Sequence, residues 1–176
     1  MFNLQESLKK EFASYKDFPK PGIIFCDILP VLRDTELFRE LIYEFGKINF
    51  IQESDAIIAI DARGFIFGSA LSFHIKKPLI LARKPGKLPG ELITYSYKLE
   101  YGENTLCLQK KAINNYHKFC ILDDLLATGG TARAVEKMLL NQSKEISGLA
   151  VVVELLDLKG STKLNCPVRS IVGLTN

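Results

Sequence analysis

Apolar positions along the chain change between two spacings, and the change predicts alternating helices and strands. Helical spacing runs from Phe2 to Tyr15 and again from Thr35 to Ile48, where Asp34 stands at the capping position. Continuous apolar runs, which are typical of buried parallel strands, lie between helical segments. Strands are expected at Ala56–Ile60, Pro78–Ala82, Phe119–Leu122, Leu149–Leu155 and Val168–Val172, and further helices at Phe65–Ile75 and Thr131–Leu140.

This alternation predicts an α/β fold with a mostly parallel central sheet flanked by helices. Ligands of such sheets bind outside the carboxyl ends of the strands, so we expect the chemistry there. Two segments interrupt the alternation. Prolines and a glycine in residues 17–32 predict an ordered loop with a short extended piece at Ile23–Phe25. Residues 83–108 predict a mobile loop followed by a β-hairpin over the sheet.

Composition narrows the class of protein. The chain has 176 residues, 47% apolar and 24% charged, which suits one ordinary globular domain. A net charge of +3 does not indicate a nucleic-acid partner, but it permits a locally basic site for an anionic substrate. The four cysteines form no C-x-x-C pair, and two histidines are too few for a histidine-rich metal site. No apolar run approaches the roughly 20 residues of a membrane span, so we expect a cytoplasmic enzyme with reduced thiols and no membrane partner.

The strongest chemical signal is the stretch FCILDDLLATGGTA, from Phe119 to Ala132. An apolar strand leads into two adjacent carboxylates, Asp123 and Asp124, and a short loop then leads into a helix. The start of a helix offers unpaired N–H groups, and glycines let the backbone approach a phosphate closely. This spacing predicts a ribose 5-phosphate site: the carboxylates accept hydrogen bonds from two ribose hydroxyls, and the phosphate binds at Thr128, Gly129, Gly130 and Thr131.

The alternative for this stretch is an exposed acidic turn beside a flexible glycine pair, and the residues alone leave it open. A Walker A loop is excluded, because no Gly-Lys-Ser or Gly-Lys-Thr follows.

The segment LDDLLATGGT resembles the phosphoribosyl pyrophosphate motif of type I phosphoribosyltransferases, in the form typical of adenine phosphoribosyltransferases. DFPKPGIIF, ARGFIFG, RKPGKLPGE and YKLEYG are similar to other segments of that family, in the family's order, so the resemblance spans roughly residues 17–157. It implies the type I phosphoribosyltransferase fold as a single domain over residues 1–176. A small hood at residues 1–32 would bind the base, and residues 83–108 would form a flexible lid and hairpin over the active site.

The implied reaction transfers the 5-phosphoribosyl group from phosphoribosyl pyrophosphate to adenine, giving AMP and pyrophosphate. Magnesium ions would be held mainly by the substrate, with no direct protein ligand. The resemblance also implies a homodimer.

The resemblance assigns roles to individual residues. Ala127 to Thr131 would hold the 5-phosphate, and Asp123 and Asp124 the ribose hydroxyls. Arg63 would contact the pyrophosphate and act in catalysis, next to a cis peptide at Asp61–Ala62. Glu100 would be the general acid or base near the purine N7. The lid would supply Arg83, Lys84, Lys87 and Tyr101, and adenine would lie against Ile24, Phe25, Cys26 and Leu125.

Two departures from the family's pattern leave the choice of base open. Cys26 stands where arginine is common, and Leu29 where serine or threonine is common. A small buried side chain that packs is the expected role of Cys26. One alternative function is therefore a 6-oxopurine phosphoribosyltransferase. The other is a non-catalytic regulator that binds phosphoribosyl pyrophosphate, but about 16 residues before Asp17 are too few for a helix-turn-helix, and Glu100 favours turnover.

Overall fold

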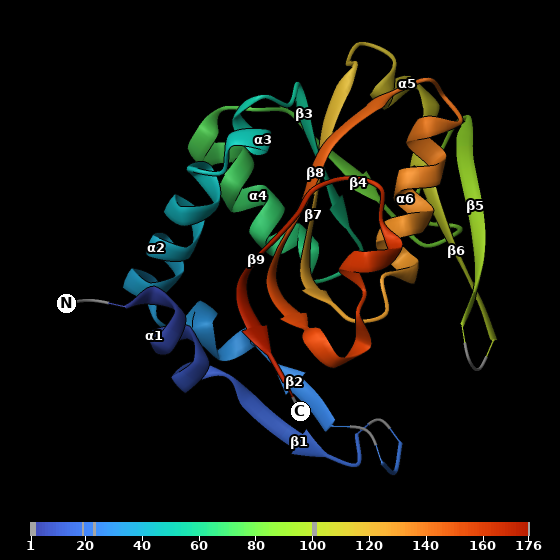
Figure 1. Ribbon diagram of the computed structural model, residues 1–176. Coiled ribbons are helices and arrows are strands. Elements are labelled where there is room, and N and C mark those ends of the chain that lie inside the picture. The colour runs from blue at the N-terminus through green and yellow to red at the C-terminus, as the bar shows by residue number, and fades with distance from the viewer. Residues whose placement is uncertain (1–2, 19, 23, 100–101, 176) are drawn as a thin grey trace.

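Five parallel strands form the centre of the computed structural model (Figure 1). The structure describes residues 3–18, 20–22, 24–99 and 102–175. The sheet order is β4-β3-β7-β8-β9, and every neighbouring pair is parallel. The strands are β3 Ala56–Ile60, β4 Leu79–Ala82, β7 Lys118–Leu126, β8 Glu145–Leu155 and β9 Val168–Leu174. The predicted α/β fold with a mostly parallel sheet is confirmed.

Helices cover both faces of the sheet, which explains why the strands appear in the sequence as continuous apolar runs. One face carries the helices α1 Leu4–Glu11, α2 Thr35–Gly46, α3 Asn49–Gln52 and α4 Gly64–Ile75. The other face carries α5 Lys110–Ile113, α6 Gly130–Leu140 and the predicted hairpin, formed by β5 Leu92–Leu99 and β6 Gly102–Gln109. Figure 1 shows the hairpin outside α6, at the edge of the molecule.

Helix α2 forms where the apolar spacing predicted it. Its buried side chains are Leu37, Leu41, Ile42 and Phe45, and all four face the core. The side chain of Asp34 accepts a hydrogen bond from the N–H of Leu37 at 3.0 Å, so the predicted cap is also confirmed.

The predicted amino-terminal helix is wrong beyond Glu11. Helix α1 ends there, and residues that had helical spacing form β1 Ala13–Lys16, which pairs antiparallel with β2 Ile24–Asp27. Tyr15 lies opposite Phe25 in this small sheet. Pairing with β2 outweighs local spacing here, because strand formation depends on the neighbours that a segment finds. Strand β2 confirms the predicted extended piece at Ile24 and Phe25 and continues to Asp27, whereas Ile23, the first residue of the predicted piece, lies outside the described residues.

Strand β7 is longer than predicted, and this places the acidic pair inside it. The expected strand ended at Leu122, but β7 continues through Asp123 and Asp124 to Leu126 because β8 keeps pairing with it. Strand β3, on the other side, pairs with β7 only as far as Leu122. Beyond Leu122, no strand of the described residues pairs with this edge of β7, and the two carboxylates lie at this part of the strand.

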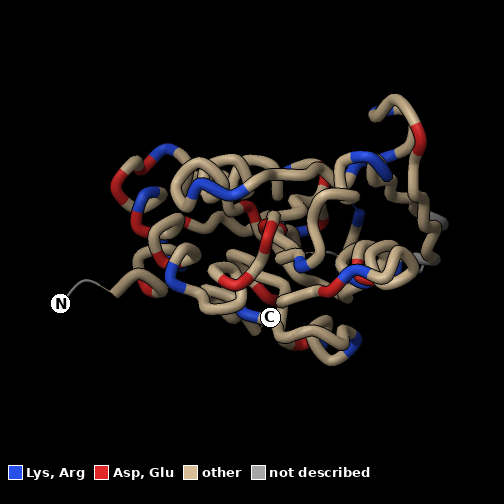
Figure 2. Tube along the Cα trace, turned by 90° about the horizontal axis from the view of Figure 1, so that it is seen from above, with Lys and Arg blue, Asp and Glu red and all other residues tan. Residues whose placement is uncertain are grey.

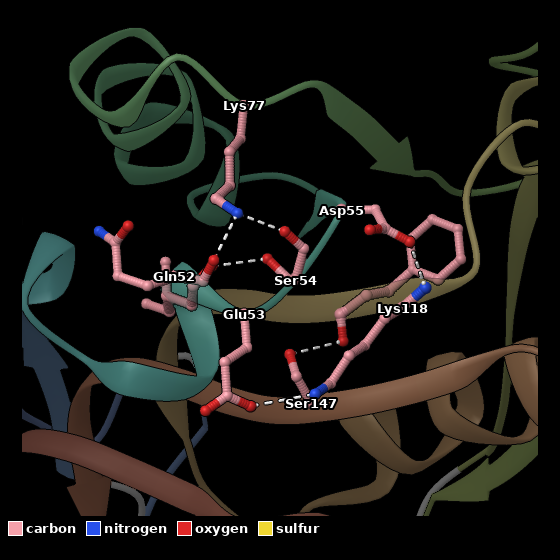
Figure 3. Close-up of polar contacts among 9 residues, drawn as sticks. Gln52, Glu53, Ser54, Asp55, Lys77, Lys118 and Ser147 are labelled. Carbon is pink, nitrogen blue, oxygen red and sulfur yellow. Dashed lines mark hydrogen bonds and ion pairs between the residues drawn. The ribbon is translucent and has the colours of Figure 1, made fainter.

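The amino ends of the strands are joined by ion pairs and hydrogen bonds, which Figure 3 shows. The carboxylate of Asp55 accepts hydrogen bonds from the backbone N–H groups of His117 and Lys118, both at 2.8 Å. These two bonds hold the pKa of Asp55 below its usual value. The ammonium of Lys118 lies 3.0 Å from the carboxylate of Glu53.

Lys77 adds a further connection at this edge. Its ammonium donates to the carbonyl oxygen of Gln52 at 2.7 Å and also to that of Ser54, just after α3 (Figure 3). A cation at these carbonyl groups satisfies acceptors that the short helix leaves free. We call Glu53, Asp55, Lys77 and Lys118 the amino-edge cluster.

Candidate active site

A cavity of about 400 Å³ opens at the opposite edge, where β3 and β7 end. Its walls are formed by residues 60–63 and 123–132, with Leu149 and Val151. Segments from two separate predicted motifs therefore meet in one place. This is the position that the fold class favours for a ligand.

The acidic pair and Arg63 form a buried charged group in this cavity. Asp124 is only 5% exposed, and its Oδ2 lies 2.8 Å from Nε of Arg63. The Oδ1 atom of Asp123 accepts the N–H of Asp124 at 2.9 Å. Burial raises the pKa of Asp123, and the neighbouring negative charge of Asp124 raises it further. Burial also raises the pKa of Asp124, although the positive charge of Arg63 opposes that shift.

Two atoms of this group have no hydrogen-bond partner among the described residues. They are Nη1 of Arg63 and Oδ2 of Asp124, which stands close to the guanidinium but accepts no hydrogen bond of good geometry from it. Unpaired buried polar atoms cost folding free energy, so they are uncommon in stable structures. Arg63 and Asp124 both line the cavity, so its wall includes a buried donor and a buried acceptor that the described residues leave without a hydrogen bond.

The turn after β3 fixes the direction of Arg63. The peptide bond Asp61–Ala62 is cis, as expected. The guanidinium carbon of Arg63 lies 5.4 Å from the centre of the Phe25 ring, which connects the turn to β2. Nε of Arg83 donates to Oδ2 of Asp61 at 3.2 Å. Two arginines are thereby held at the same edge of the sheet, where an anion with several charges could bind.

The loop between β7 and α6 has the shape of an anion cradle. Gly129 has a φ of +81°, a conformation that side chains rarely adopt, and α6 begins at the next residue. The first N–H groups of α6 thus point into the cavity with the helix dipole behind them. Gly160 supports the loop from outside: a methyl group there would overlap the carbonyl oxygen of Ala127, and one at Gly129 would lie 2.6 Å from the carbonyl oxygen of Gly160.

Comparison with known proteins agrees with this geometry. The phosphoribosyl transferase domain model matches residues 35–166. An adenine phosphoribosyltransferase of Prochlorococcus marinus (strain MIT 9211) is 55% identical over 163 residues, which cover 93% of this chain and 95% of the relative. The chain belongs to the adenine phosphoribosyltransferase family.

Solved structures of this family share the fold. The adenine phosphoribosyltransferase of Rhodothermus marinus DSM 4252 has a TM-score of 0.90 and 38% identity, with 97% of this chain and 98% of that chain covered. The Saccharomyces cerevisiae adenine phosphoribosyltransferase, solved with adenine and an imino-altritol bisphosphate, has a TM-score of 0.83 and 34% identity, with 95% and 97% covered. The type I phosphoribosyltransferase fold expected from the sequence is therefore confirmed.

The residues that the family resemblance assigned to adenine are only partly brought together. Leu125 lines the cavity, and Phe25 lies against the guanidinium of Arg63. Ile24 is 47% exposed on β2. Cys26 is buried and packs with the apolar core, as expected, and burial raises the pKa of its thiol. All four cysteines are free thiols.

The lid residues differ in how they are placed. Arg83 is bound to Asp61, whereas Lys84 and Lys87 are exposed on the loop that follows. The predicted residues Glu100 and Tyr101 lie outside the described residues. Their roles stay predictions that follow from the family resemblance.

The sequence did not indicate two residues that contact the loop between β7 and α6 from outside the cavity. Gly160 carried no signal except its place between two strands. The hydroxyl of Tyr97, on β5, lies 3.0 Å from the hydroxyl of Thr131 at the start of α6. The alternation of β5 could have indicated that Tyr97 faces the sheet, but it could not have named the element that it meets.

Surface charge and helix length add two observations. Figure 2 shows Lys and Arg positions mixed with Asp and Glu positions around the molecule, in agreement with the small net charge. Among the described residues, every helix is too short or too polar to cross a bilayer.

Proposed function

We propose that the chain is a purine salvage enzyme that transfers the 5-phosphoribosyl group from phosphoribosyl pyrophosphate to adenine, releasing AMP and pyrophosphate. The observation that carries this proposal is the buried acidic pair beside Arg63, in a cavity that ends at the glycine loop of α6. A sugar diol, a phosphate and a pyrophosphate need acceptors, helix N–H groups and guanidinium, respectively. All three kinds of group line this one cavity.

The ribose 5-phosphate binds across the end of β7 in this proposal. Asp123 and Asp124 accept hydrogen bonds from the two ribose hydroxyls, which gives Asp124 Oδ2 the donor that it lacks. The phosphate accepts N–H groups and hydroxyls from residues 127–131. Charge-assisted hydrogen bonds of this kind are stronger than neutral ones, so the sugar phosphate is held at both ends.

The pyrophosphate group occupies the side of Arg63. Its Nη1 atom is buried and free to donate, and Arg83, Lys84 and Lys87 add positive charge from the lid as it closes. Closure of residues 83–108 would also exclude water from an activated sugar. Mg²⁺ prefers oxygen ligands and would be held mainly by the substrate's own phosphates, because the described residues contain no group of three or more His, Cys, Asp or Glu side chains that could hold a metal ion. When bound, the ion neutralises charge on the leaving pyrophosphate.

Adenine binds under the hood, residues 1–32, between Phe25 and Leu125, with Ile24 and Cys26 beside it. Its N9 forms a bond to the anomeric carbon while the bond from that carbon to pyrophosphate oxygen breaks, through a transition state that resembles an oxocarbenium ion. Glu100 handles the base's proton near N7, and Tyr101 packs over the closed site. Support for adenine comes from the 34% identical yeast enzyme that was solved with adenine, and from the relatives' names.

The test of this proposal is a panel of bases. Adenine, hypoxanthine and guanine are each incubated with phosphoribosyl pyrophosphate and Mg²⁺, and the products are identified by mass spectrometry. We expect AMP from adenine. IMP or GMP in place of AMP would favour a 6-oxopurine enzyme, and no nucleotide from any base would favour a non-catalytic regulator.

We also propose a homodimer and a cytoplasmic location. On α2 and α4 the side chains of Tyr43, Ile66 and Phe73 are exposed, and Phe73 is 89% exposed. Apolar surface of this kind is commonly covered by a partner. Light scattering at several concentrations would test the dimer. Free thiols suit a reducing compartment, and fractionation of the cell would test the location.

A further inference from the structure

Tyr97 connects the hairpin to the phosphate loop. Its hydroxyl lies 3.0 Å from Oγ1 of Thr131, a separation at which either oxygen can donate. Its ring also lies against the loop: a methyl group at Gly130 would stand 3.4 Å from Cδ2 and 3.6 Å from Cε2 of the ring. The tyrosine is partly buried, and it comes from β5, a strand with no residue in the wall of the cavity among the described residues.

A phosphate at the loop decides the direction of this hydrogen bond. A hydroxyl has one proton to donate and two lone pairs to accept with. A phosphate dianion only accepts, so Thr131 must turn its own proton toward the phosphate. The Tyr97 hydroxyl then donates to Thr131, and the two bonds form a chain that points at the ligand. Hydrogen bonds in such chains polarise and strengthen one another.

We propose that Tyr97 is a positioning residue for the 5-phosphate. It holds the hydroxyl of Thr131 in the rotamer that faces the cavity, and it donates to that oxygen when the phosphate accepts the threonine's proton. This inference rests on the proposed function, because it requires Thr131 to bind the 5-phosphate. Tyr97 acts through Thr131 and does not itself touch the substrate.

The experiment compares two tyrosines of the same strand. Tyr97→Phe removes one hydroxyl and keeps the ring. Tyr95→Phe is the matched control, because Tyr95 is also partly buried against the core of that face and its hydroxyl has no hydrogen bond to any described residue. Binding of ribose 5-phosphate, AMP and adenosine to the whole protein is measured by calorimetry. Adenosine lacks the phosphate and serves as the ligand control.

We expect Tyr97→Phe to weaken ribose 5-phosphate and AMP by about 2- to 10-fold, the usual range for one neutral hydrogen bond. Tyr95→Phe should leave both unchanged, and adenosine should bind all variants equally. In turnover with phosphoribosyl pyrophosphate, Tyr97→Phe should raise KM for that substrate more than it lowers kcat.

A double-mutant cycle with Thr131 separates positioning from general packing. Once Thr131→Val has removed the threonine hydroxyl, adding Tyr97→Phe should have no further effect. Thr131→Ser keeps the hydroxyl and should keep the sensitivity to Tyr97→Phe. Additive losses, equal behaviour of the two tyrosine variants, or an equal loss of adenosine binding would each overturn the proposal.

Binding to the parent protein and to the variant distinguishes failure of the proposed function from failure of the role of Tyr97. If the parent protein binds no ribose 5-phosphate, the proposed function fails. If the parent binds it and Tyr97→Phe binds it equally well, only the role of Tyr97 fails. Circular dichroism and thermal unfolding show whether each variant is folded.

Discussion

The two edges of the central sheet differ in how completely their charged side chains are hydrogen-bonded. At the amino edge, Asp55 accepts two backbone N–H groups, and Lys77 and Lys118 each have an acceptor within 3.0 Å. At the carboxyl edge, Asp124 is buried and the Arg63 side chain is about as exposed as that of Lys118, yet Arg63 and Asp124 each keep a buried polar atom without a hydrogen bond to the described residues. In this molecule, the charged side chains with buried atoms are therefore not the ones whose hydrogen bonds are complete.

This difference separates charged groups that stabilise the fold from those that we propose bind the substrate. The pKa of Asp55 is lowered by its hydrogen bonds, so its ionised form stabilises the folded state. The pKa of Asp123 is raised by burial and by a like charge, so its ionised form costs folding free energy. A protein keeps such a cost where function requires it.

The largest expected effect follows removal of the acceptor nearest Arg63. Asp124→Ala deletes the proposed ribose contact and leaves the guanidinium without its counter-ion, so kcat/KM for phosphoribosyl pyrophosphate should fall roughly 100-fold or more. Steady-state kinetics measures this. The matched control is Glu53→Ala at the amino edge, which also removes a carboxylate that pairs with a cation and should leave activity unchanged. Equal activities of the two variants would contradict a functional difference between the two edges.

A substitution at Gly160, which contacts the loop between β7 and α6, should have the next largest effect. Gly160→Ala places a methyl group onto the carbonyl oxygen of Ala127, so the loop must move, and affinity for ribose 5-phosphate should fall about 10-fold or more. The control is Gly173→Ala, whose methyl group meets the end of the Leu156 side chain at 3.0 Å and can be accommodated by a rotation of that side chain. Calorimetry on both variants measures the difference. Undiminished binding in Gly160→Ala would show that the loop tolerates displacement.

Asp123→Asn should stabilise the folded protein while it lowers activity. Because the folded-state pKa of Asp123 is raised, its destabilising effect is present above the unfolded pKa of about 3.9 and absent below it. The variant should therefore gain about 1–3 kcal/mol in free energy of unfolding at pH 7, and the gain should disappear near pH 3. Urea unfolding at both pH values measures it. A loss of stability at pH 7 would mean that the carboxylate is satisfied in the folded protein.

The smallest effect is expected at Asp55. Because its folded-state pKa is lowered, the stability that it contributes is present above the unfolded pKa and is lost as the pH falls through the folded pKa. Asp55→Ala should cost about 1 kcal/mol at pH 7, since the group is exposed to solvent, and nothing in strong acid. Thermal unfolding gives the cost, and kinetics should show unchanged turnover. A large loss of activity would contradict our expectation that the amino edge and the cavity act independently.

The sequence predicted the sheet well because buried parallel strands leave an unmistakable apolar pattern. The predicted strand Ala56–Ile60 has the same first and last residues as β3. Helix α2 with its Asp34 cap was expected from local chemistry alone. The end of β7 was not, because its length depends on how far β8 runs beside it. Strand β1 was missed for a similar reason, since its partner β2 lies across a turn.

The candidate site also contains residues that are contiguous in the sequence and residues that only the fold brings together. Asp123, Asp124 and the glycine loop are continuous in sequence, so their spacing could predict that they meet, and the structure brings them together in one cavity. Arg63 and Arg83 entered only through the family resemblance, and the structure then placed both at the same edge. Tyr97 and Gly160 could not be found from the sequence, because each acts by a contact with a loop far away along the chain.

A crystal structure of the protein with bound AMP tests the central claim most directly. We expect the ribose hydroxyls on the carboxylates of Asp123 and Asp124 and the phosphate at residues 127–131. AMP bound elsewhere on the molecule, with this cavity left to solvent, would contradict it.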